Sequence, residues 1–241
     1  MMRLVQDGHV YEDWLSGSEG TRRQNGLVVS TGELESEIDY IIANNIEHVH
    51  ITLLDPKFFI YGAEYALAHR QEGNSLRLEA DLSMLRKCRQ IRSLALEGNI
   101  LHAEVLDDLP ELESLAIDNT MGKSRMQLQN LKLHTLYIQK PGRNIEGFDR
   151  IEGLRELAVW NYQPKSRNLW ELSGLNALEK LMLIRPRIDS LEGLERLSRL
   201  TVLEIHYSRT LKDISALRRR PDLKDVKMSH VPNVEGENKL L

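Results

Sequence analysis

A six-residue frame repeats seven times along this chain of 241 residues, and it constrains the fold more than any other feature. In each copy an apolar residue is followed after three positions by a second one and after two more by a third, as in Leu200-Thr-Val-Leu203-Glu-Ile205. The copies begin at Ile91, Leu112, Leu133, Leu154, Leu178, Leu200 and Leu223, which lie 21 to 24 residues apart. A helical bundle would not keep such a pair in register, so the frame favours stacked repeats.

Further apolar residues precede the frames at steps of three, as Leu191, Leu194 and Leu197 precede Leu200. An amphipathic helix mixes steps of three and four, and a half-buried strand alternates in twos, so each repeat must change structure partway along. The combined pattern resembles the leucine-rich repeat family, and between Leu183 and Ile205 it is most similar to its bacterial internalin-like and phosphatase-regulator-like variants. The resemblance covers residues 75–231.

The resemblance implies an α/β solenoid with a concave parallel β-sheet and helical or 3₁₀ convex arms. The last two apolar residues of each frame would form a short strand, and stacked repeats would share one core. Only Asn99 stands where the family places an asparagine after the strand, so irregular turns are expected. The predicted organisation is an N-terminal cap with a helix at 1–45, the repeats at 46–231 and a tail at 232–241.

Local signals predict the structure of the N-terminal part. Ser30 and Glu33 match a capping box, and the apolar stripe that follows predicts a helix ending near Asn44. The remaining expected elements are a strand frame at 46–51, a second helix from Asp55-Pro56 through Leu67, and a strand at Leu76 to Leu78, which brings the stacked strands to about nine. Residues 1–30 are expected to cover the first edge of the stack, because terminal repeats must hide their apolar face.

Composition limits the function classes. The chain is 41% hydrophobic and 28% charged, which suits one large globular domain or two small ones. Its net charge of −4 gives no general attraction to nucleic acid or to an anionic membrane. The single cysteine, the start without a signal-peptide core and the lack of a membrane-spanning apolar run predict a cytoplasmic protein.

A search for catalytic motifs finds no phosphate loop, no H-E-x-x-H, no C-x-x-C and no G-x-S-x-G. The prediction is therefore a protein that is not an enzyme and needs neither a cofactor nor a metal. His48 and His50 form the only close histidine pair, and on the exposed face of a strand they would hold a metal only if a carboxylate joined them. Cys88 is expected to be a buried apolar residue.

Residues that alternate with the core positions along each strand would line the concave face. Large apolar side chains there form one predicted patch with Trp160 as its anchor, and an acidic row of Glu79, Glu97 and Asp118 lies beside it. The predicted partner-binding residues are Tyr137, Trp160, Met182, Ile184, Glu97, Asp118, Glu156 and Glu204. Aromatic anchors within a charged surround are typical of protein-binding hot spots, and the acidic residues predict basic groups on the partner.

The loops after the strands carry pairs of basic residues in five consecutive repeats. This predicted basic rim consists of Lys140, Arg143, Lys165, Arg167, Arg185 and Arg187, with Lys123, Arg125, Arg209 and Lys212 in the same loops. A rim of this kind offers an alternative function, the binding of nucleic acid or of an acidic partner, although the net charge argues against nucleic acid. The run 218–220 of three arginines is expected on the solvated convex surface.

The sequence thus predicts a non-catalytic protein-binding module that is monomeric when unbound and does not bind membranes. Its repeats resemble bacterial ones, and the chain is similar to small stand-alone repeat proteins that recognise one protein partner. Some proteins of that kind neutralise a toxin as its immunity factor, and the resemblance implies this finer function by analogy.

Overall fold

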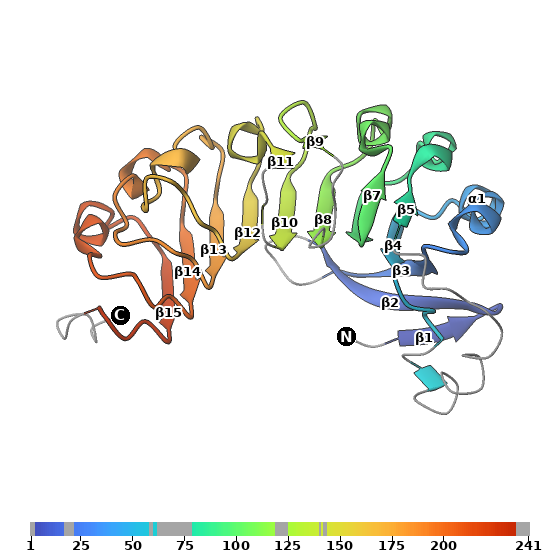
Figure 1. Ribbon diagram of the computed structural model, residues 1–241, viewed down its shortest axis with the longest axis horizontal. Coiled ribbons are helices and arrows are strands. Elements are labelled where there is room, and N and C mark those ends of the chain that lie inside the picture. The colour runs from blue at the N-terminus through green and yellow to red at the C-terminus, as the bar shows by residue number, and fades with distance from the viewer. Residues whose placement is uncertain are drawn as a thin grey trace. The chain divides into compact units, whose positions relative to one another are not determined.

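The computed structural model describes residues 3–16, 22–57, 60–61, 79–118, 125–139, 141 and 144–234. The chain forms two compact units, Met1–Met126 and Gln127–Leu241. Figure 1 shows the elements of each unit, with the strands along one side and the helical segments along the other. Among the described residues, no helix combines the length and the hydropathy that crossing a bilayer requires.

The first unit contains a six-stranded sheet. Its strands in spatial order are β1 (Arg3–Gln6), β2 (His9–Ser16), β3 (Arg22–Ser30), β4 (His48–Thr52), β6 (Ser93–Glu97) and β8 (Ser114–Asp118). The first three strands are antiparallel to one another, whereas β3, β4, β6 and β8 run parallel. Beside them lie helix α1 (Leu34–Ala43), the 3₁₀ segments η1 (Ser83–Lys87) and η2 (Ala103–Asp108), and a separate parallel pair, β5 (Glu79–Asp81) with β7 (Asn99–Leu101).

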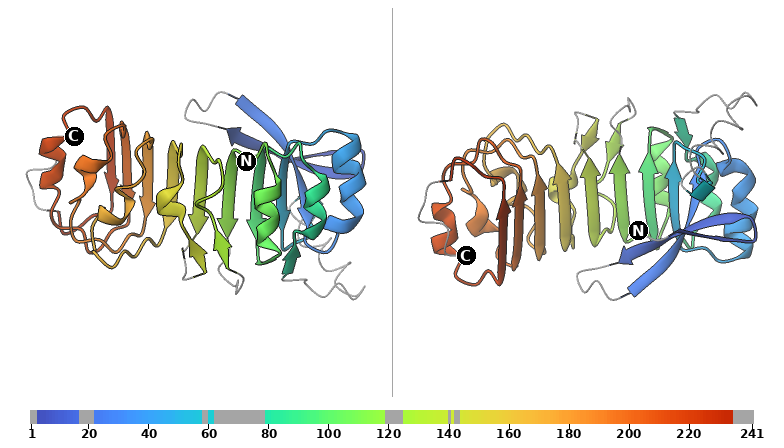
Figure 2. Two further views of the ribbon diagram at one scale, coloured as in Figure 1. Left: turned by 90° about the horizontal axis from the view of Figure 1, so that it is seen from above. Right: turned by 90° about the horizontal axis from the view of Figure 1, so that it is seen from below.

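The second unit contains five parallel strands, which Figure 2 shows running side by side. They are β10 (Thr135–Gln139), β12 (Glu156–Trp160), β13 (Lys180–Ile184), β14 (Val202–His206) and β15 (Asp225–Ser229). Between them lie η3 (Phe148–Arg150), η4 (Trp170–Leu172), η5 (Leu194–Arg196) and η6 (Ser215–Arg219), and β9 (Met126–Gln127) pairs with β11 (Ile145–Glu146). Every strand thus returns to its neighbour through a short helical arm.

The seven predicted strand frames all form strands; six of their apolar pairs are buried in the core, and the last pair, Val226 and Met228 on β15, is half-buried. From β6 to β14 these side chains are at most 2% exposed: Leu94, Leu96, Leu115, Ile117, Leu136, Ile138, Leu157, Val159, Leu181, Leu183, Leu203 and Ile205. A repeat therefore consists of one parallel strand and a return arm around a shared core, and six of the described arms contain a 3₁₀ segment. This is the predicted leucine-rich repeat fold.

The leucines that step by three are joined by backbone hydrogen bonds of the same step. The Leu194 amide donates to the Leu191 carbonyl at 3.1 Å, Leu197 to Leu194 at 3.1 Å and Leu200 to Leu197 at 2.9 Å. Such i→i+3 turns have three residues per turn, so every third side chain lies on the same side of the arm. All four leucines are fully buried.

The N-terminal part confirms the first predicted helix and the cover of the first edge, but not the capping box. Helix α1 has Glu33 as its N-cap without a side-chain capping bond, and the Ser30 hydroxyl donates to the Glu33 carboxylate instead. Ser30 ends strand β3 and so lies too early to cap the helix. The edge is covered by the antiparallel strands β1 and β2, for which the repeat pattern gave no signal.

The predicted extra strand does not lie between β4 and β6, because these two strands hydrogen-bond to each other. Its frame at 76–78, and the second predicted helix beyond residue 61, are outside the described residues. Glu79 belongs to β5, which pairs with β7 outside the main sheet, so its predicted place in the acidic row is wrong. Cys88 is fully buried, as expected, and burial raises the pKa of its thiol to about 11. The predicted boundaries at 45 and 231 separate the cap, the repeats and the tail. The division into compact units does not test them, so they stay a prediction.

Arg218 and Arg219 are exposed, as predicted for the arginine run, but Arg220 is not, because only 6% of it is exposed. Its guanidinium donates to the carbonyls of Leu194 and Leu197 at 2.8 Å and of Leu200 at 2.7 Å. It also contacts the Asp222 carboxylate at 2.9 and 2.7 Å. The carbonyls of Leu194 and Leu197 also accept the turn bonds of their own arm, so Arg220 adds a second donor to each and ties two neighbouring arms together.

We expect Arg220→Met to lower the free energy of unfolding of the chain by about 2–3 kcal/mol, because three buried hydrogen bonds from a charged donor would be lost while the side-chain volume is kept. Urea unfolding followed by circular dichroism measures this. The matched control is Arg219→Met, since Arg219 is exposed and makes one surface ion pair to Glu195. Equal unfolding midpoints for the two variants would show that the buried bonds contribute nothing.

Candidate functional site

The open face of the second unit, opposite the 3₁₀ arms, carries the predicted apolar patch. Trp160 pairs with Ile184 in register, and Met182 lies two residues before Ile184 on β13. Tyr137 pairs with Ala158 on β12, which pairs in turn with Met182. All four large side chains are half-buried, as positions that alternate with the core should be. We call Tyr137, Trp160, Met182 and Ile184 the apolar surface.

The acidic residues expected beside this surface are already engaged within the chain. Glu156 is only 6% exposed and so is not offered to a partner. The Glu204 carboxylate is 12% exposed and lies 3.9 Å from Lys180, 3.7 Å from Lys227 and 3.5 Å from His206. Neither residue therefore presents a free negative charge for a basic partner.

The two other acidic residues, Glu97 and Asp118, belong to the first unit, where they pair in register on β6 and β8. The Glu97 carboxylate accepts hydrogen bonds from His50 at 3.2 Å, from the Thr52 hydroxyl at 2.8 Å and from the Leu53 amide at 3.3 Å. One carboxylate oxygen of Asp118 is buried and finds no hydrogen-bond partner among the described residues. Glu97 is thus a structural group of the first unit.

The histidine pair is not exposed, contrary to expectation. His48 is 9% exposed, and burial lowers its pKa. His50 is 14% exposed and lies between two carboxylates, with Nδ1 2.7 Å from Glu12 and Nε2 3.2 Å from Glu97. In the described part of the chain, no group of three histidine, cysteine or acidic residues is arranged to hold a metal ion.

The carboxylates around His50 change how it titrates. Burial disfavours the charged imidazolium, but the hydrogen bonds to Glu12 and Glu97 outweigh it and raise the pKa of His50 to about 9. The same bond from His50, against the cost of burial, lowers the pKa of Glu97 to about 2. At neutral pH a charged imidazolium therefore joins β2, β4 and β6 of the first unit.

The basic rim divides into three groups. Lys123, Lys140 and Arg143 are outside the described residues. Arg167 is exposed and makes a two-bond contact with Asp189, with nitrogen to oxygen distances of 2.5 and 2.6 Å. Lys165, Arg125 and Lys212 are exposed as well and do not line the cavity formed by the other three arginines.

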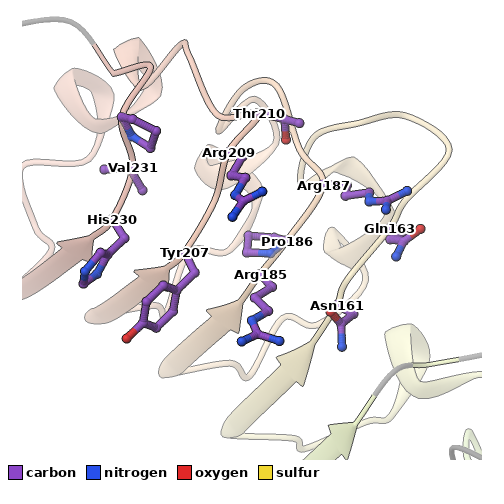
Figure 3. A pocket seen from close by; sticks show the side chains of 11 residues that line it. Asn161, Gln163, Arg185, Pro186, Arg187, Tyr207, Arg209, Thr210, His230 and Val231 are labelled. Atoms are coloured by element: carbon purple, nitrogen blue, oxygen red, sulfur yellow. The ribbon is translucent and has the colours of Figure 1, made fainter.

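Arg185, Arg187 and Arg209 line a groove of about 970 Å³ at the loop edge of the second unit, where the strands end (Figure 3). The other lining residues are Asn161, Gln163, Pro186, Tyr207, Thr210, His230, Val231 and Pro232. Sequence analysis missed the aromatic pair in it, in which the rings of Tyr207 and His230 stack with centroids 4.5 Å apart. We call this cavity the arginine groove.

Comparison with known proteins gives structural matches only. Neither a protein-family model nor a curated protein matches the sequence. Internalin C2 from Listeria monocytogenes strain 4b F2365 is 17% identical, with a TM-score of 0.34 over 76% of this chain and 69% of that one. An internalin (inlF) from the same strain is 19% identical, with a TM-score of 0.42 over 88% of this chain and 72% of that one.

We expect the His50 contacts to stabilise the first unit at neutral pH and to weaken in alkali. The pKa of His50 is about 9 in the folded chain against an ordinary 6.5, so the stabilisation is complete below pH 6.5 and is lost as pH rises through 9. The pKa of Glu97 is about 2 against 4.5, so its contribution holds above pH 4.5 and is lost only in strong acid.

Thermal unfolding at about pH 6 and about pH 10 measures the effect, with His50→Gln as the variant that keeps a hydrogen-bonding side chain but does not titrate. Wild type should lose more stability than this variant between the two pH values. His102→Gln is the control, because His102 lies exposed in the same unit. An equal loss in wild type and in His50→Gln would contradict the role of His50.

Proposed function

We propose that this chain is a non-catalytic protein-binding module whose second unit binds a protein partner on the open face of its sheet. The observation that supports this best is the apolar surface. Strand register gives Trp160, Ile184, Met182 and Tyr137 positions that alternate with the buried pairs, so these side chains face away from the core. A soluble protein rarely exposes several large apolar side chains side by side without using them.

The backbone beneath this surface is held in place before any partner arrives. The amides of Arg155, Glu179, Thr201 and Lys224 each donate to the carbonyl one repeat earlier, at 2.8 to 2.9 Å, just before the strands. The strands that carry the surface are therefore fixed at their starts as well as along their length. A preformed surface loses little conformational entropy on binding, which favours affinity.

The positions of Glu156 and Glu204 in the structure change the kind of partner that we expect. Glu156 is buried and Glu204 is surrounded by cations, so we propose that apolar contacts provide most of the affinity and that no basic cluster is needed on the partner. The finer predictions from sequence are a toxin-neutralising immunity role, a cytoplasmic location and a monomeric unbound state. Affinity capture from the native host, followed by identification of the captured protein, tests the first of these.

Trp160→Ala should weaken binding of that captured protein by about 30-fold or more, because truncating a central aromatic anchor commonly costs about 2 kcal/mol or more. Isothermal titration calorimetry measures the affinity, and circular dichroism checks the fold. Little loss of thermal stability is expected, since Trp160 faces away from the core.

Trp170→Ala is the matched control. Trp170 lies on the arm η4 rather than on a strand, is 38% exposed and has the Arg196 guanidinium 5.2 Å from its ring. Its truncation should leave affinity unchanged. If the partner binds Trp160→Ala as tightly as wild type, the apolar surface is not its site. The same conclusion follows if Trp160→Ala and Trp170→Ala weaken binding equally.

A further inference from the structure

The arginine groove is built by a backbone feature that recurs after the strands of the second unit. The residue that follows each of the strands β12 to β15 is in the left-handed conformation, with φ of 56° at Asn161, 54° at Arg185, 58° at Tyr207 and 56° at His230. Their amides extend the sheet by one further bond: Asn161 donates to Ile184 and Arg185 to His206 at 2.7 Å, and Tyr207 to Ser229 at 2.9 Å. This ladder fixes the edge from which the groove side chains project.

After each left-handed residue, buried and exposed positions alternate. Pro186 and Ser208 come next and are buried, and Arg187 and Arg209 after them are exposed. The groove thus has two columns of side chains, one of Arg185, Tyr207 and His230 and one of Arg187 and Arg209, which Figure 3 shows on neighbouring loops.

Large side chains occupy the left-handed positions at a conformational cost. In the first unit the equivalent residue after β6 is Gly98, with φ of 94°, for which this backbone shape carries no strain. Arginine, tyrosine and histidine pay a penalty of about 1 kcal/mol or more each at such a position.

The charge of the groove is unbalanced. Three of its eleven lining residues are arginines and none is acidic. Across the described part of the chain, no carboxylate forms an ion pair with Arg185, Arg187 or Arg209, whereas nearby Arg167 and Arg220 pair with Asp189 and Asp222. Arg187 and Arg209 also occupy equivalent positions in adjacent repeats, and like charges so placed repel each other.

We propose that the arginine groove binds an acidic, extended segment of a protein partner, with side-chain carboxylates held by the three guanidinium groups. The planar fork of arginine matches a carboxylate in two-bond geometry, as Arg167 and Asp189 show on the same unit. The stacked rings of Tyr207 and His230 form an aromatic wall for the rest of the segment. This site is separate from the apolar surface and does not depend on it.

A polypeptide fits these features better than nucleic acid does. Nucleic-acid binding relies on many phosphate contacts and on ring faces that are free to stack with bases. The groove offers three cations on a chain of net charge −4, and one face of Tyr207 is already covered by His230. Carboxylates spaced along an extended segment need only the contacts that the groove provides.

Fluorescence anisotropy with a labelled octaglutamate peptide tests the proposal on the full chain at low ionic strength. The triple variant Arg185→Gln, Arg187→Gln, Arg209→Gln should bind the peptide about tenfold or more weakly than wild type. The matched control is Arg155→Gln, Arg199→Gln, Lys224→Gln, which removes the same charge from exposed residues near the opposite ends of the strands and should bind as wild type does.

Trp160→Ala is expected to bind the peptide as tightly as wild type does. The test of the arginine groove is therefore independent of the test of the apolar surface. No binding by wild type, or an equal loss in both triple variants, would overturn the proposal. An eight-nucleotide oligothymidylate that binds more tightly than the peptide, and is lost only in the groove variant, would overturn it in favour of nucleic acid.

Discussion

The i→i+3 turns that join leucines three residues apart are the constraint on which the remaining structure depends. An arm with three residues per turn keeps Leu191, Leu194, Leu197 and Leu200 on one side, whereas 3.6 residues per turn would rotate the later ones away from the core. The arm returns the chain to the start of the next strand, and β14 and β15 pair in register.

That register decides which side chains are displayed as well as which are buried. Burial of Leu181 and Leu183 forces Met182 and Ile184 onto the open face, since neighbours along a strand point to opposite sides. The left-handed residue Arg185 shifts this alternation by one position, so that buried Pro186 stands between exposed Arg185 and Arg187. Both candidate surfaces are therefore consequences of how the core stacks, and their chemistry is free to vary without loss of the fold.

Features within one repeat could be predicted from the sequence, and features that depend on distant residues could not. The frame predicted the strands, and alternation predicted that Trp160 and Ile184 share a face. The burial of His50 depends on Glu12, which is 38 residues away, and that of Arg220 on carbonyls up to 26 residues away. Strands β1 and β2 carry no repeat frame, so only the open edge beside β3 indicated that something covers it.

Ion pairs between equivalent parts of neighbouring repeats show why the arginine groove is unusual. Arg86 pairs with Asp108, Arg92 with Glu113 and Arg167 with Asp189, each about one repeat apart. Stacking places residues of equal repeat position side by side, so a repeat protein balances an arginine with a carboxylate from the next repeat. At the groove the neighbour of Arg187 is instead Arg209, and that of Arg185 is Tyr207. The next repeat places no carboxylate beside these arginines, so an anionic group of a partner would supply the missing counter-charge.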